Sequence, residues 1–176
     1  MGQRIIISES EKNNIRLLYE QSSNMLSFEK VVDVPDMTKD NLFNSLKGNR
    51  ELFRNGSLQN EISGQQLKIE KEILLDKNMY KSLGFSPGLS WTCWYGPLKF
   101  DITIIVKDNK YKIICDNFIW TNQGSGCQQL MSLNPLTKDK PKGLTTAYAW
   151  DTVSKAATKY VDNFLNQIIT TSNDDF

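Results

Sequence analysis

The segment 100–120, FDITIIVKDNKYKIICDNFIW, constrains the fold more than any other part of the chain. Two stretches rich in β-branched and aromatic residues flank the polar pair Asp108-Asn109. Such side chains favour strands, and Asp and Asn tolerate the backbone of a tight turn. We therefore expect a β-hairpin with strands over 98–107 and 110–120.

Three upstream segments also show strand patterns. Residues 27–34 alternate between apolar and polar side chains and stop at Pro35, which cannot continue a ladder of hydrogen bonds. Residues 65–75 favour a second strand, although LKIEKEILL also fits a short helix, and residues 91–95 favour a third. These strands and the hairpin predict an antiparallel β-meander.

A first helix is predicted after Pro35. Thr38 can cap its start, and Leu42, Phe43 and Leu46 recur at helical spacing, with an extension to Phe53 despite Gly48. The stretches 76–90 and 122–143 contain the Gly, Pro and Asn signals of loops.

The clearest helix lies near the C-terminus. Its apolar positions follow the i, i+3, i+4, i+7 template of an amphipathic helix. They are Val153, Ala156, Ala157, Tyr160, Val161, Phe164, Leu165, Ile168 and Ile169. A stripe of this length requires a sheet face to cover it. The chain is therefore predicted to be an α+β protein, an antiparallel meander packed against this helix and a second one.

The predicted organisation is one domain over residues 25–171, preceded by a helical segment over 1–24 and followed by a frayed tail over 172–176. Ser8-Glu9-Ser10-Glu11 has the pattern of a capping box at the start of the N-terminal helix. Ile15, Leu18 and Tyr19 share one face of that helix and are the candidate docking residues for a partner.

The composition indicates which kinds of partner are to be expected. The formal net charge is +1, so no global field attracts nucleic acid or anionic lipid. No apolar run is long enough for a transmembrane helix, and MGQRIIISESEK lacks the apolar core of a signal peptide. Three widely spaced cysteines fit reduced thiols. We expect a protein partner or a homo-oligomer, neither nucleic acid nor a membrane, and a location in the bacterial cytoplasm or in a virion.

The residue inventory disfavours catalysis. Histidine is absent from the chain, which removes Ser-His and Cys-His nucleophiles and the usual zinc ligands. Gly124-Ser125-Gly126-Cys127 lacks the further glycine of a dinucleotide loop and the Gly-Lys-Ser/Thr of a phosphate loop. We predict no catalytic residue, no metal site and no cofactor, and Cys115 is expected to be a small buried side chain within a strand.

An aromatic group is the candidate binding surface. It consists of Trp91, Trp94, Tyr95 and Trp120. In a strand over 91–95, Trp91 and Tyr95 would share one face and Trp94 would point to the other. Either one of these aromatics is exposed and available to a partner, or the helices and the sheet bury them all.

The motifs of the first strand and helix resemble a known family. Phe28 to Pro35 (FEKVVDVP), Thr38 to Phe43 (TKDNLF) and the hairpin end Asp116-Asn117-Phe118 are similar to a Bacteroidota domain family of unknown function with a TBP-like fold. The resemblance covers about residues 27–120 and implies a TBP-like sheet, which the C-terminal helix would complete. It implies no functional residues. Many members are secreted or lipid-anchored, whereas this chain has no recognisable signal.

The N-terminal segment resembles leader helices on proteins of tailed phages. Leu18-Tyr19-Glu20 matches the Leu-x-Glu pattern at which T4-like prohead proteases cut capsid-targeting peptides. The resemblance implies Leu18 and Glu20 as a processing site; the alternative is an ordinary amphipathic helix that packs on the domain or is swapped between domains.

Together these features predict a non-enzymatic interaction or accessory protein, with a phage-encoded, virion-associated protein as its concrete form. The alternative is a small-molecule or polymer-binding module that uses the aromatic surface. A hydrolytic enzyme is the least favoured reading, since it would have to rely on aspartate or Cys127.

Overall fold

The computed structural model describes residues 24–85, 94–123, 133, 136–140, 142 and 144–174, with side chains of the last stretch described from 149 to 168. Along the chain the elements are β1 (Phe28–Asp33), α2 (Lys39–Gly48), α3 (Arg50–Phe53), β2 (Gly56–Ile62), β3 (Gln66–Leu75), α4 (Lys77–Ser82), β4 (Gly96–Lys107), β5 (Lys110–Trp120) and α5 (Leu144–Asp174).

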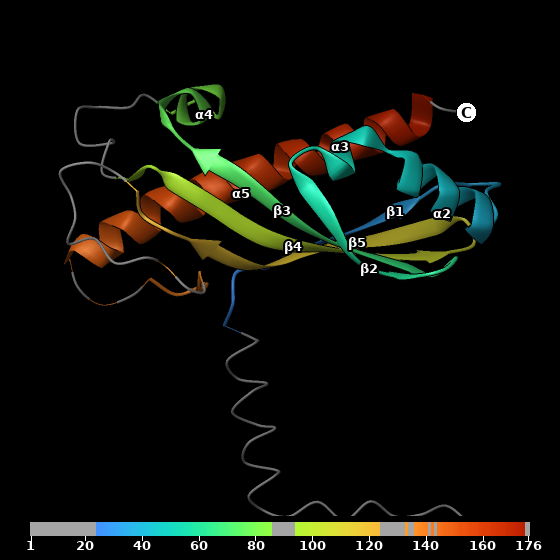
Figure 1. Cartoon of the computed structure of the whole chain (residues 1–176), viewed down its shortest axis with the longest axis horizontal. Coiled ribbons are helices and arrows are strands. Elements are labelled where there is room, and N and C mark those ends of the chain that lie inside the picture. Colours follow the sequence, from blue (N-terminus) through green and yellow to red (C-terminus); the bar gives the residue numbers. More distant parts are fainter. Residues whose placement is uncertain are drawn as a thin grey trace, which may run out of the picture.

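The strands form one antiparallel sheet in the order β1-β5-β4-β3-β2 (Figure 1). Its centre is the predicted hairpin, in which Lys107 pairs with Lys110 around a two-residue turn. Asn109 in that turn has a φ of 61°, a left-handed conformation that asparagine tolerates well. The hairpin prediction is confirmed, and the strand over 65–75 prevails over the alternative helix.

The hairpin turn also holds the start of the first helix. The Asp108 carboxylate accepts a hydrogen bond from the Lys39 backbone N–H at 2.9 Å, and the Asn109 side-chain oxygen accepts one from Met37 N–H at 3.1 Å. Thr38 caps α2 as its sequence position predicts. The turn and the helix start therefore stabilise each other.

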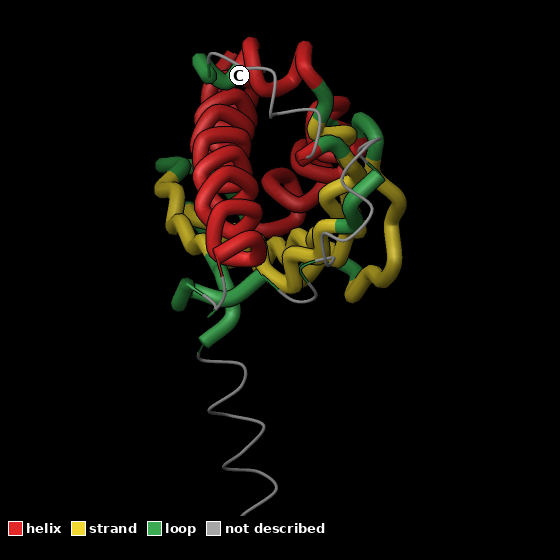
Figure 2. Tube along the Cα trace, turned by 90° about the vertical axis from the view of Figure 1, so that its left-hand side faces the viewer, coloured by secondary structure: helices red, strands yellow, loops and turns green. Residues whose placement is uncertain are grey.

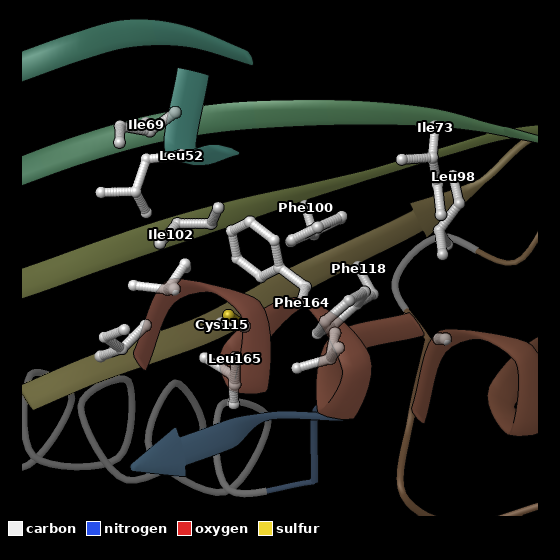
Figure 3. Packing of buried hydrophobic residues seen from close by; sticks show 14 of the residues in the cluster. Leu52, Ile69, Ile73, Leu98, Phe100, Ile102, Cys115, Phe118, Phe164 and Leu165 are labelled. Carbon is white, nitrogen blue, oxygen red and sulfur yellow. The ribbon is translucent and has the colours of Figure 1, made fainter. Parts of the chain in front are cut away.

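The helices gather on one side of the sheet, and α5 runs along it (Figures 1 and 2). Phe164 and Leu165 of α5 lie in one cluster with strand residues such as Phe100 and Phe118 (Figure 3). The rings of Phe100 and Phe118 stack with their centroids 5.0 Å apart. The core thus forms between the apolar stripe of α5 and one face of the sheet, as the α+β expectation requires.

Several local predictions are wrong. A strand was expected over residues 91–95, but Trp94 and Tyr95 are not in a strand and directly precede β4. Residues 91–93 lie outside the described part. The predicted loop 76–90 contains α4, which Asp76 caps through Met79 N–H at 2.8 Å. A helix this short has no apolar periodicity for sequence analysis to detect.

The sequence analysis did not predict β2, and it placed the ends of two helices differently. The sequence of β2, GSLQNEI, shows no clear alternation because this edge strand is exposed along most of its length. Asn49 ends α2 and caps α3 through two backbone N–H groups, so the expected single helix to Phe53 is divided in two. Helix α5 continues to Asp174, where a frayed tail was expected from residue 172.

Candidate functional site

One face of the sheet is not covered by any of the described helices and is a candidate contact surface. Side chains alternate strictly along β3 and β4: Leu67, Ile69, Ile102 and Ile104 are buried on the helix side, and their neighbours point to the opposite face. We call that opposite side the open face. Because it is formed by strands, its side chains are fixed in register and present a defined surface.

An aliphatic patch lies at one end of the open face. It consists of Val31, Ile62, Ile105 and Ile114. The strand register places Val31, Ile105 and Ile62 in a single row across the sheet, separated by Lys112 and Gln66. Val31 is 55% and Ile62 is 47% exposed, and the other two are half-buried. Exposed side chains of this kind are costly in water unless a partner covers them.

A hollow adjoins this patch. Its volume is about 430 Å³, and its walls include Ile62, Ile105, Lys39 and Asp108. The patch is therefore not flat, and its hollow has both apolar walls and charged groups at the rim.

Charged side chains cover the middle of the open face. Lys68 pairs with Asp101 at 3.1 Å and Lys99 with Glu72 at 3.1 Å. Burial, and then the neighbouring Asp101, raises the pKa of the Asp116 carboxyl, whereas Lys68 lowers it. These cross-strand ion pairs keep this part of the face polar and bound the aliphatic patch on one side.

The described residues hold no cluster of three or more cysteine, aspartate or glutamate side chains suited to a metal ion. Cys115 is fully buried in β5, as expected, and burial raises the pKa of its thiol to about 12. A thiol with such a pKa is protonated near neutral pH and is a poor nucleophile.

Three of the four residues of the predicted aromatic group, Trp94, Tyr95 and Trp120, lie within the described residues. Trp120 is fully buried and therefore does not contribute to an exposed surface. Trp94 and Tyr95 are half-buried and pack against the core; Tyr80 donates a hydrogen bond to the Trp94 carbonyl at 2.9 Å and stacks on Tyr95 at 6.3 Å. Both residues thus anchor α4. Trp91 lies outside the described residues, as do Ile15, Leu18, Tyr19 and Glu20 of the N-terminal segment.

Sequence analysis missed Lys71, the one charged side chain among those described that is almost fully buried, with 2% exposed. Its ammonium donates hydrogen bonds to the carbonyls of Glu51 at 2.8 Å and Arg54 at 2.6 Å, at the end of α3. It also lies 4.6 Å from the centroid of the Phe164 ring. The signal was present in the alternation of β3, where Lys71 occupies an inward position between Ile69 and Ile73.

The architecture matches that of solved proteins. A TBP-like protein from Parabacteroides distasonis superimposes with a TM-score of 0.59 over 85% of this chain and 93% of its own length, at 12% sequence identity. The fold is TBP-like. This confirms the architecture implied by the resemblance of the first strand, helix and hairpin.

A second structure, a DUF4468 family protein from Bacteroides ovatus, aligns over 77% of this chain and 86% of its own, with a TM-score of 0.38 and 15% identity. The sequence matches no family model. It also has no detectable similarity to a curated protein. None of the described helices is long and apolar enough to cross a membrane.

Proposed function

We propose that this chain is a non-enzymatic protein-binding module and that the aliphatic patch of the open face is its contact surface. The observation that carries the proposal is the row formed by Val31, Ile105 and Ile62 across all five strands, with Ile114 beside it. Protein interfaces combine such an apolar centre with a polar rim.

The surroundings of the patch support this function. Lys112, which lies between Val31 and Ile105 in the row, forms an ion pair with Glu29, and Lys107 and Asp108 line the adjacent hollow. Lys107 and Asp108 supply a charged rim that orients a partner and excludes others, and the Lys112–Glu29 pair adds a charged group within the row itself.

The residue chemistry favours binding over catalysis. The chain has no histidine, and burial keeps the Cys115 thiol protonated near neutral pH. The alternative is a small-molecule or polymer-binding site formed by Trp91, Trp94, Tyr95 and Trp120. It has less support, because Trp120 is buried and because Trp94 and Tyr95 contact Tyr80 and hold α4 in place.

Two measurements on the full chain test the proposal. The first is light scattering over a range of concentrations, which detects self-association. The second is photo-crosslinking in source cells with a crosslinking residue at Ile114 or, as a control, at Lys81, an exposed position on α4. A second copy or another protein should be captured from Ile114 and not from Lys81.

A matched pair of variants gives the test its specificity. Val31→Asp places a charge in the aliphatic patch and should abolish the association. Leu58→Asp is the control: Leu58 is 43% exposed, but its register with the buried Ile69 places it on the helix side of the sheet. Association that is absent, or equally sensitive to both substitutions, would contradict the proposal.

A further inference from the structure

The outer edge of β1 is open to a further strand. β1 is an edge strand of the sheet, and among the described residues it pairs only with β5, on its inner side. That pairing runs through its six residues without a register shift. The opposite edge strand, β2, has a shift between Leu58 and Asn60, and a bulge of this kind protects an edge from pairing. Of the two edges, β1 is therefore the one suited to accept another strand.

Main-chain groups on this edge lack partners among the described residues. The Val34 N–H, just after β1, donates to the Asn109 carbonyl of the hairpin turn at 2.8 Å, so Val34 faces β5. In an antiparallel ladder, residues that bond to the neighbouring strand alternate with residues whose N–H and C=O groups point away from it. The register therefore turns the N–H and C=O groups of Glu29, Val31 and Asp33 outward. Such a row is a template for strand addition.

A hollow lies between this edge and α5. Its volume is about 540 Å³. Phe28 of β1 and Leu165 of α5 provide apolar walls, and Asp162 and Asn166 of α5 add polar groups. Lys30, which also lines the hollow, donates from its ammonium to the Asn166 side-chain oxygen at 3.4 Å. Helix α5 thus leaves space on the helix side of the edge for the side chains of an added strand.

The sequence of β1 disfavours a second copy as the added strand. Antiparallel pairing of two β1 strands about Glu29 or Lys30 sets like charges opposite each other, and pairing one residue further along sets Glu29 opposite Asp33. Lys112 contacts Glu29 at 2.6 Å and reduces the repulsion there, but it does not act on a pair of Lys30 ammonium groups. A further shift brings Pro35, which has no N–H to donate, into the ladder. A segment with a different sequence avoids these contacts.

We infer that the outer edge of β1 binds an extended segment of another protein, which adds a strand to the sheet. The outward N–H and C=O groups of Glu29, Val31 and Asp33 give the affinity, and alternate side chains of the segment give the specificity. Those on the helix side enter the hollow between Phe28 and Leu165, which favours apolar residues there. This site consists of main-chain groups and stands without the function proposed for the aliphatic patch.

Selection of nine-residue peptides from a random phage-displayed library on the full chain tests the inference. A selected peptide is then synthesised in two forms, with N-methyl groups on one or the other set of alternate residues. An added strand directs one set of its N–H groups to β1 and the other set to solvent. Methylation of the first set should weaken binding by about tenfold or more, because several hydrogen bonds are lost. Methylation of the second set should leave the affinity unchanged.

A matched pair of variants assigns the site to β1. Val31→Pro removes the central outward donor and leaves the bonds between β1 and β5 in place, since proline is tolerated on the outer side of an edge strand. It should weaken the peptide by about tenfold or more. Val31→Thr keeps the N–H and the β-branched shape and should bind as the wild type does.

Each contrary result would overturn the inference. These results are the absence of any enriched peptide, equal affinities of the two methylated forms, and equal affinities of Val31→Pro and Val31→Thr. Loss of binding in Ile105→Asp but not in Val31→Pro would place the peptide on the aliphatic patch. A dimer that Val31→Pro converts into a monomer would show that a second copy occupies the edge. Should Val31→Pro fail to fold, the two methylated forms decide on the wild-type chain.

Discussion

Lys71 is the residue at which burial and charge compete most strongly. Burial lowers the pKa of its ammonium from 10.5 to about 8; Glu51 opposes this shift, Arg54 adds to it, and Cys115 from β5 opposes it. The ammonium is retained because the carbonyls at the end of α3 need donors.

The pH dependence of stability follows from this shift. Between the folded-state pKa of about 8 and the unfolded value of 10.5, the unfolded chain binds more protons than the folded one. Stability should therefore rise with pH through this window. Between pH 7 and pH 9 the gain in the free energy of unfolding from Lys71 should be roughly 1 kcal/mol, measurable by urea denaturation.

Lys71→Met is the direct test of that assignment. The variant should lose the rise between pH 7 and pH 9, whereas Lys110→Met should retain it. The range stops at pH 9 because burial also raises the pKa of both Cys115 and Tyr160 to about 12. In the unfolded chain these two groups release their protons at a lower pH than in the folded protein, so stability falls as the pH rises further. An unchanged slope in Lys71→Met would assign the effect to another group.

At the scale of elements, the start of β4 is fixed by a close approach of two backbones. A Cβ added to Gly96 would overlap the Thr121 carbonyl oxygen. The two backbone segments cannot easily move apart, because two hydrogen bonds join them. The Thr121 N–H donates to the Pro97 carbonyl at 3.1 Å, and the Gln123 N–H donates to the Tyr95 carbonyl at 2.7 Å. Gly96 is therefore required by packing.

Gly96→Ala should lower the free energy of unfolding by about 1–3 kcal/mol. Gly48→Ala is the opposite case, since a Cβ at this last residue of α2 meets nothing within 4 Å. It should raise stability by about 0.5 kcal/mol, because alanine favours a helix more than glycine does. Thermal denaturation of both variants measures the contrast, and equal effects would refute the packing argument.

The elements that sequence analysis predicted share one property, a regular burial pattern. The hairpin strands alternate because one face is buried, and α5 has a continuous apolar stripe for the same reason. Strand β2 and helix α4 escaped prediction because one is an exposed edge and the other is held by Tyr80 and its contacts to Trp94 and Tyr95.

At the scale of the whole molecule, the capsid-targeting hypothesis concerns residues 1–24, most of which lie outside the described part. It predicts cleavage after Glu20, so that protein from its native source would begin at Gln21. The intact mass measures this directly. A chain that retains residues 1–20 would contradict processing and leave the segment as a docking element or a part of the fold.

The sequence by itself determined the α+β class, the hairpin and the amphipathic α5, because each depends on the local periodicity of side chains that one neighbouring layer buries. Its motifs also led to the TBP-like fold. Only the tertiary structure decided that β1 lies beside β5, that Trp120 is buried and that Lys71 meets the end of α3.

The aliphatic patch was likewise invisible in the sequence. Val31, Ile62 and Ile105 lie in strands that are distant along the chain. Their proximity results from strand order and helix packing, which local periodicity does not encode. Whether an apolar side chain is buried or exposed depends on which element covers it, and that is settled only when the layers assemble.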